Sequence, residues 1–290
     1  NVWNPSSHLT MNNVTLTDGI DLLESGGSLD FTNSTCSSWG RIGHDYVNMT
    51  NVSFGSYLNI DSALNHAHLH NVTVASQLRG TVNDLRLEDV DTGHGADTLR
   101  ANKLWMSNST MSLDGSGTYY IYVSDLDNTN NASTSDVYIY NSTLSFSANT
   151  NSNNHFIFNI NTAGDIRIID SEINATNFET SKIELEGSDI WITNSTLWSG
   201  TKYTGSGCYH HCSNEDLYSY LNIYGDDLEV DNSLLHSRTE APSLSTANSG
   251  YWLKTYNYVD ISVVDLEIND SSLTTYSYMN YIQWGSNYRG

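Results

Sequence analysis

Carboxylates recur at one position of this chain, directly before segments in which apolar residues alternate with polar ones. The six are Asp84, Asp136, Asp165, Asp189, Asp227 and Asp265. If these segments stack as parallel strands about 4.8 Å apart, the carboxylates form a column and repel one another unless a cation bridges them. Ca²⁺ is the hard cation that carboxylate oxygens prefer, so it is the candidate cofactor. The alternative, which the sequence favours, is that Asp is a common turn residue before a strand.

Three histidines at alternate positions, His66, His68 and His70, are expected to project from one outer face of a strand. Asp84 and Glu88 fall beside them on the next repeat. Imidazoles with a carboxylate suit Zn²⁺ or Cu²⁺, which makes this group a second candidate metal site. A solvated histidine-rich strand is the commoner arrangement, and both interpretations stay open.

The three cysteines cannot all pair with one another. Cys208 and Cys212 enclose three residues and are candidates for a small disulfide loop, which fits an oxidising compartment. The two histidines between them and the acidic residues that follow leave metal binding as the alternative. Cys36 falls at an inward apolar position and is expected to be an inert buried thiol.

Large aromatic residues share one outward position of the repeat. They are Trp105, Tyr138 and Trp191, and Arg167 interrupts the series. Exposed aromatic rings in line can stack on sugars or on another subunit. The polar loops at 112–135 and 199–216 can equally cover them.

The charge balance excludes several classes of protein. The 290 residues carry 33 Asp and Glu against 11 Lys and Arg, a formal net charge of −22. Such a chain cannot bind nucleic acid by neutralising phosphates, and an anionic membrane surface would repel it. No apolar run approaches the roughly 18 residues of a membrane-spanning helix. Eleven Asn-x-Ser/Thr sequons favour an extracellular or cell-surface location.

The element that must position these residues is a repeat with the pattern apolar-x-apolar-x-[Asn/Asp]-[Val/Ser]-x-apolar, as in VNMTNVSF at 47–54 and IWITNSTL at 190–197. Its eleven anchors are Asn13, Asn33, Asn51, Asn71, Asp89, Asn108, Asn141, Asp170, Asn194, Asn232 and Asp270. The period of two inside each copy indicates a strand. Short, regular spacing indicates stacked turns of a parallel β-solenoid with one domain over 1–290, compact over 8–111 and more looped over 112–290.

Each anchor is expected to adopt the left-handed conformation at a bend, because Asn tolerates it. It shares the parity of the apolar residues before it, so the sequence predicts inward Asn stacks, followed by inward Val or Ser. Seven sequons coincide with these anchors: Asn13, Asn33, Asn51, Asn71, Asn108, Asn141 and Asn194. A buried Asn cannot carry a glycan. The expected glycosylation sites are therefore Asn48, Asn131, Asn174 and Asn269.

With these eleven copies, about residues 8–275 resemble the right-handed parallel β-helix, or pectin-lyase-like, superfamily, and most of all secreted archaeal and bacterial surface proteins with such repeats. The resemblance implies an all-β, right-handed solenoid of about eleven coils. Hydrolases of that superfamily carry Gly-Asp-Asp and Gly-His-Gly elements, which 225–227 and 93–95 match, but in reversed order and several coils apart. Its lyases hold Ca²⁺ on Asp residues and use a basic residue, for which Arg167 is the nearest candidate. The sequence assigns no catalytic residue.

Neither end of the chain shows a cap, and an uncovered solenoid end is a row of unpaired strands. The leading expectation is a non-enzymatic extracellular structural or adhesive protein, such as a surface-layer or filament subunit that assembles through its ends. Expected partners are other copies, surface proteins or glycans. A fragment or processed piece of a longer protein would look the same. The alternatives are a Ca²⁺-dependent polysaccharide lyase and a glycan-binding module.

Overall fold

A computed structural model describes residues 8–23, 26–93, 98–114, 119–124, 133–147, 155–177, 180–202, 215–241 and 253–279. Every regular element in these ranges is a β-strand, and every strand pairing is parallel. This confirms the predicted all-β class and gives a β-helix-like arrangement. The same ranges contain no helix long and apolar enough to cross a membrane.

The strands form three rows, and each strand pairs with its counterpart one repeat later. Row 1 precedes the anchors and takes in all or part of β1 (His8–Asn12), β4 (Ser28–Cys36), β6 (Tyr46–Phe54), β7 (Leu58–Val74), β8 (Leu78–Glu88), β10 (Thr98–Ser107), β13 (Val137–Tyr140), β16 (Ile166–Ile169), β19 (Asp189–Thr193), β21 (Glu215–Asp231) and β23 (Leu253–Asn269). Row 2 follows the anchors and takes in β2 (Thr15–Leu16), the ends of β4, β6 and β7, β9 (Asp91–Thr92), β11 (Thr110–Asp114), β14 (Thr143–Ser147), β17 (Glu172–Asn177), β20 (Thr196–Lys202), β22 (Leu234–Ala241) and β24 (Ser272–Met279).

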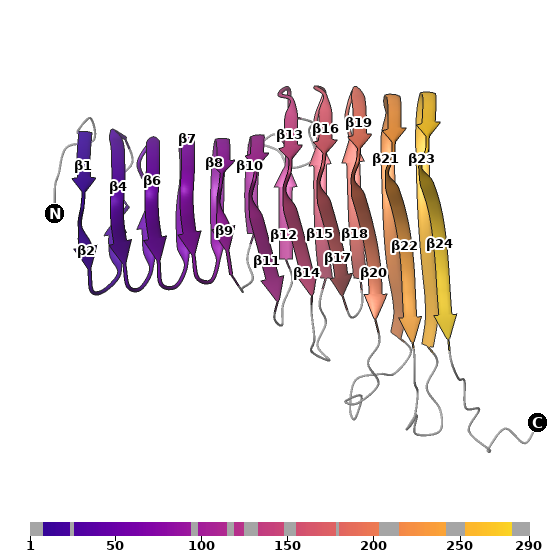
Figure 1. The fold of residues 1–290 in the computed structure, drawn as a ribbon, viewed down its shortest axis with the longest axis horizontal. Helices are drawn as coiled ribbons and strands as arrows, with labels where there is room; N and C mark the ends of the chain where they lie inside the picture. The colour runs from indigo at the N-terminus through magenta and orange to yellow at the C-terminus, as the bar shows by residue number, and fades with distance from the viewer. Residues whose placement is uncertain are drawn as a thin grey trace, which may run out of the picture.

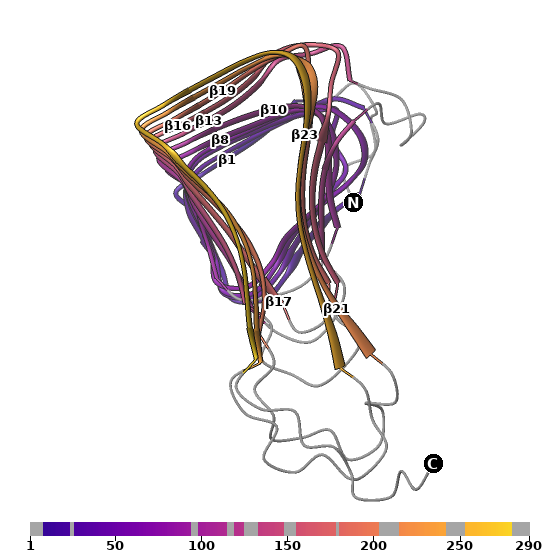
Figure 2. The same ribbon diagram turned by 90° about the vertical axis from the view of Figure 1, so that its right-hand side faces the viewer.

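Row 3 closes each turn. It takes in β3 (Ile20–Leu22), β5 (Gly40–Ile42), β12 (Tyr119–Val123), β15 (His155–Asn161), β18 (Thr180–Glu186) and the first parts of β7, β8, β10, β21 and β23. Figure 1 shows the strands side by side along the length of the molecule, in chain order from indigo to yellow. Figure 2, turned by 90°, shows the rows as an elongated ring around a common interior. The later turns reach further toward the narrow end of that ring, where β17 and β21 lie close to its tip.

The interior is apolar along most of its length. Buried side chains alternate with outward ones, as in β6, where Val47, Met49, Val52 and Phe54 are each at most 3 % exposed. Toward the narrow end of the later turns the buried side chains become polar. Ser181, Ser199, Ser219 and Ser237 are 0 % exposed and bond to one another across the interior. The hydroxyls satisfy their own hydrogen bonds, so this part is filled without a large apolar core.

The repeat anchors are the only residues other than glycine with positive φ among those that the structure describes. All eleven predicted anchors have φ between 45° and 56°. The left-handed bend that the sequence predicts is therefore confirmed at each one. Because this conformation favours Asn and Asp over most residues, it explains why the repeat restricts the position so strictly.

The direction of the anchors corrects the prediction of an inward stack. Every anchor side chain is exposed, whereas the residue after it is buried or half-buried, as with Asn33 and Ser34. Strict alternation of faces holds only in extended backbone, and the left-handed anchor breaks it. The stack itself exists on the outside, where Asn51 Nδ2 donates to Asn33 Oδ1 at 2.9 Å and Asn232 Nδ2 donates to Asn194 Oδ1 at 2.8 Å.

The inner counterpart of this exposed stack is a ladder of serines. The Oγ of Ser195 accepts a hydrogen bond from the Ser171 backbone N–H at 3.1 Å and donates to the Thr193 carbonyl at 2.7 Å. Ser142, Ser171 and Ser233 repeat the arrangement. The predicted inward position of these serines is confirmed, and it satisfies backbone groups at each bend that would otherwise be left without a partner.

Candidate functional site

The outer face of row 1 carries most of the residues to which the sequence assigns chemistry. Near the start of the chain this face has a shallow hollow of about 350 Å³, bordered by Asp30, Tyr46, His66, Asp84 and Arg86. The Tyr46 ring is 52 % exposed and stacks on His66, with the ring centroids 5.2 Å apart. The hollow thus combines an aromatic ring with hydrogen-bond donors and acceptors.

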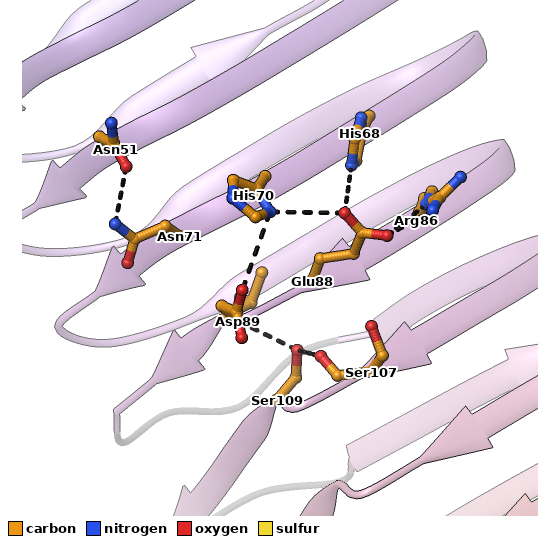
Figure 3. A network of polar contacts seen from close by, with 10 residues as sticks. Asn51, His68, His70, Asn71, Arg86, Glu88, Asp89, Ser107 and Ser109 are labelled. Carbon is orange, nitrogen blue, oxygen red and sulfur yellow. Dashed lines mark hydrogen bonds and ion pairs between the residues drawn. The ribbon is translucent and has the colours of Figure 1, made fainter.

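The three predicted histidines do lie on one face, and each contacts a carboxylate of the next turn. Figure 3 shows the contacts of His68 and His70 with Glu88. His66 Nδ1 is 3.2 Å from Asp84 Oδ2, and His68 Nε2 is 3.1 Å from Glu88 Oε2. His70 Nδ1 is 3.4 Å from the same Glu88 oxygen. The Arg86 guanidinium also binds Glu88, and that hydrogen bond is the main reason that the pKa of Glu88 lies below its ordinary value.

In these pairs the carboxylates already serve as partners of the histidines, and the metal site stays a prediction. No group of three or more His, Cys, Asp or Glu side chains among the described residues is arranged to hold a metal ion. His66 contacts Asp84, whereas His68 and His70 share one oxygen of Glu88. Arg86 adds a positive charge at Glu88, where a cation would have to bind.

The aspartate column is present in part. Asp136 and Asp165 are neighbours, since the Asp165 N–H donates to Asp136 Oδ1 at 3.0 Å. The strand register continues the column through Asp189, Asp227 and Asp265. Asp84 is separated from the others, because the register places Lys103 beside it.

Asp189, the middle member of this column, has a raised pKa. Partial desolvation, followed by the neighbouring carboxylates of Asp165 and Asp227, raises the pKa of Asp189. Arg167 opposes this effect and binds Asp165 with Nη2 2.8 Å from Oδ2. The Asp165 carboxylate is thus paired with a guanidinium, and the turn-residue and cation-binding interpretations of the column both stay predictions.

The predicted line of aromatic residues forms a continuous ladder along the axis. The rings of Trp105 and Tyr138 lie 4.8 Å apart, and the Arg167 guanidinium lies between Tyr138 and Trp191, 5.2 and 4.5 Å from their ring centres. Arg86 covers the other side of Trp105 at 5.4 Å. We call Arg86, Trp105, Tyr138, Arg167 and Trp191 the arginine–aromatic ladder. Trp105 is 36 % exposed, and its neighbours cover much of both ring faces.

Arg167 is fully engaged within this ladder. Its Nη1 donates to the Tyr138 hydroxyl at 2.7 Å, and that hydroxyl donates to Asp136 Oδ2 at 3.1 Å. Desolvation, reinforced by the bond to Asp136, raises the pKa of Tyr138. A base that abstracts a proton from a substrate needs an unoccupied nitrogen within hydrogen-bond reach. The Arg167 geometry therefore gives no support to a role as a base.

The Gly225-Asp226-Asp227 string lies in β21, where the backbone N–H groups of both aspartates donate to the Ser188 carbonyl. Beside it a second hollow of about 380 Å³ is bordered by Glu186, Tyr224 and Asp226. Desolvation and a hydrogen bond to Asp260 raise the pKa of Tyr224 to about 12. His94 of the Gly-His-Gly string lies outside the described residues, so its distance from Asp226 stays a prediction.

Several other predicted sites are placed individually. Cys36 is fully buried as a free thiol, as predicted. Cys208, Cys212 and Asn131 lie outside the described residues. Among the predicted glycosylation sites, Asn48 and Asn269 are exposed and Asn174 is half-buried.

One aromatic group was not predicted. Tyr218 and Tyr220 of β21 stack on Tyr256 and Tyr258 of β23, with ring planes within 9° and centroids 4.9 and 5.2 Å apart. The signal was present in the sequence as Tyr-Ser-Tyr at 218–220 and Tyr-Asn-Tyr at 256–258. The two strings are 38 residues apart, the same interval that separates the anchors Asn232 and Asp270, so the pairing of β21 with β23 sets the rings side by side.

By this geometry the chain is an all-β protein whose parallel strands have a β-helix-like arrangement. No protein-family model, curated protein or solved structure matches the chain. Function is therefore inferred from the arrangement of the side chains.

Proposed function

We propose that this protein is a non-enzymatic, extracellular structural or adhesive β-helix, right-handed and of about eleven turns, like the pectin-lyase-like superfamily that its sequence resembles. The right hand is supported by a general rule, because crossover connections between parallel strands are right-handed in about 98 % of cases. The eleven left-handed anchors, one for each repeat, support the number of turns.

The observation that carries this proposal is that outward side chains bind their counterparts on neighbouring turns. The anchors bond to anchors, the histidines of row 1 to carboxylates one turn on, and the tyrosines of β21 to those of β23. In an active site, by contrast, several different side chains converge on one ligand. Ladders of this kind stiffen the molecule along its axis, which is what a rod-like structural protein requires.

Self-association is supported by the apolar side chains of β23 and β24. Leu266, Ile268 and Leu273 are 52, 40 and 44 % exposed. Their counterparts on the preceding turn, Leu228, Val230 and Leu235, are at most 2 % exposed. Exposed strand edges with apolar side chains pair readily with other chains. We propose a second copy of this chain as the partner, since His8 of its β1 would meet the acidic side of β23 at Asp265.

Light scattering after size-exclusion chromatography, with electron microscopy over rising protein concentration, tests this proposal. We expect ordered oligomers from the natural chain and monomers from a Leu266→Asp/Ile268→Asp variant. Ser262→Asp, on the exposed outer face of β23, is the matched control and should assemble normally. A natural chain that stays monomeric at all concentrations would contradict the proposal.

Glycan binding is the second candidate, because the hollow near Asp30 and Tyr46 adjoins the arginine–aromatic ladder through Arg86. Binding to a glycan panel, compared between the natural chain and a Trp105→Ala/Trp191→Ala variant, tests it. If the variant binds the same glycans equally well, the arginine–aromatic ladder is not part of the glycan-binding surface. A polysaccharide lyase stays a further alternative that no arrangement of the described residues favours.

A further inference from the structure

Because the anchor side chains are exposed, the Asn residues of the repeat are themselves accessible for glycosylation. The seven anchor sequons at Asn13, Asn33, Asn51, Asn71, Asn108, Asn141 and Asn194 all have exposed side chains. Burial therefore does not protect them. The feature that distinguishes one anchor from another is the hydrogen bonding of its amide nitrogen.

In most anchor sequons the amide nitrogen is engaged. Nδ2 of Asn51, Asn71 and Asn141 donates to the preceding anchor at 2.9, 2.7 and 2.8 Å. Asn194 Nδ2 donates to Asp170 at 3.0 Å, and Asn33 Nδ2 donates to Asn12 at 3.2 Å. A transferase must draw the amide away from these partners before it can react, which opposes the reaction in the folded protein.

Asn108 lacks this restraint. Its Oδ1 accepts the bond from Asn141, but its Nδ2 donates to no partner within the described residues. The preceding anchor is Asp89, whose Oδ2 instead lies 3.8 Å from His70 Nδ1 (Figure 3). The hydroxyl residue of the sequon, Thr110, is exposed, while Ser109 is buried and holds the bend through its bond to the Ser107 carbonyl. Asn108 is thus presented on a fixed bend with its amide nitrogen available. Asn13 is likewise exposed, and its Nδ2 also donates to no partner in the part of the chain that the structure describes.

We infer that Asn108 is an N-glycosylation site of the folded protein, while the anchors that donate through Nδ2 are protected. The donor would be an oligosaccharide carried on an isoprenoid diphosphate. Asn108 Nδ2 forms a bond to the anomeric carbon and gives up one proton. The bond from that carbon to the diphosphate breaks, and the diphosphate leaves with the electron pair. Exposure to such a donor in nature rests on the proposed extracellular location, but the reactivity of the folded chain does not.

The test uses purified folded protein, a single-subunit oligosaccharyltransferase and its isoprenoid-diphosphate-linked oligosaccharide. The transferase is one that modifies synthetic peptides spanning Asn51 and Asn108. Mass spectrometry measures the initial rate of glycosylation at each site. The ratio of this rate to the rate for the matching peptide is then compared between sites. We expect this ratio to be about three- to tenfold higher at Asn108 than at Asn51, Asn71, Asn141 or Asn194. Equal ratios, or an Asn108 that reacts only in the peptide, would overturn the inference.

A pair of variants tests the cause. Asn33→Gly removes the oxygen that accepts from Asn51 Nδ2 and still permits positive φ, whereas Asn33→Asp retains an accepting oxygen. The rate ratio at Asn51 should rise in Asn33→Gly and stay low in Asn33→Asp. If the ratio is the same in both variants, hydrogen bonding of the ladder does not control the modification. Self-association plays no part in either measurement, so a failure of the proposed function would be recognised separately.

Discussion

Asn71 Nδ2 donates a 2.7 Å hydrogen bond to Asn51 Oδ1, although 20 residues separate the two along the chain. Both residues have positive φ, 50° at Asn71 and 56° at Asn51, and both side chains are exposed. The same residue type therefore does two things at each turn: it permits the bend and links the bend to the next one. Separate substitutions can measure these two contributions.

Asn71→Ala and Asn71→Gly should destabilise the protein by different amounts. Both remove the hydrogen bond from Asn71 to Asn51, which is worth about 0.5–1.5 kcal/mol. Alanine also introduces a Cβ that is unfavourable at positive φ, at about 1–2 kcal/mol, whereas glycine tolerates this conformation. We expect the free energy of unfolding in urea to fall about 1 kcal/mol further for Asn71→Ala. Equal losses would mean that the left-handed backbone places little constraint on this position.

Ser195→Ala should be costly despite its small change in volume. It removes the acceptor of the Ser171 N–H and leaves that buried group without a partner, which costs about 1–3 kcal/mol. Ser262→Ala, at an exposed outward position of β23, is the control and should change stability by less than about 0.5 kcal/mol. Urea unfolding of the two variants makes the comparison. Similar losses would indicate that water enters the bend and satisfies the N–H.

Arg167→Lys should weaken the arginine–aromatic ladder although it conserves the charge. Lysine cannot place one planar group between Tyr138 and Trp191 while also binding Asp165 and the Tyr138 hydroxyl. We expect a loss of about 1–2 kcal/mol and a changed near-ultraviolet circular dichroism spectrum from the tryptophans. Lys103→Ala, at an exposed position of β10, should leave both measurements close to those of the natural chain. An Arg167→Lys variant of unchanged stability would show that the charge alone suffices.

Glu88 should contribute a definite part of the acid sensitivity. The bond from Arg86 lowers the pKa of Glu88 below its ordinary value of 4.5, so the folded state favours the carboxylate. The resulting stabilisation is present above about pH 4.5 and is lost as the pH falls through the lowered pKa. Between pH 5 and pH 3, Tm should fall more for the natural chain than for Glu88→Gln. Parallel curves would indicate that Glu88 titrates alike in the folded and unfolded states.

The sequence was a good guide to what depends on local conformation. The period of two predicted the strands, and the regular Asn or Asp predicted the left-handed bends, because both preferences belong to single residues and their immediate neighbours. The sequence was a poor guide to the direction of side chains at the bend. Counting alternate positions predicts an inward Asn33, but this count fails once a residue leaves the extended conformation, and Asn33 is exposed.

By itself, the sequence determined the all-β class, the eleven bends and the inward serines that follow them, since steric preference and burial fix these within each repeat. The tertiary structure alone decided how the outward side chains meet. Equal distances from the anchors already place Lys103 beside Asp84 and Arg167 in line with Tyr138 and Trp191. Only the side-chain conformations show that the Arg167 guanidinium contacts both rings and also binds Asp165. The tertiary structure also decided that Asn108 Nδ2 donates to no partner among the described residues, because a hydrogen bond between turns depends on the partner that the strand register supplies.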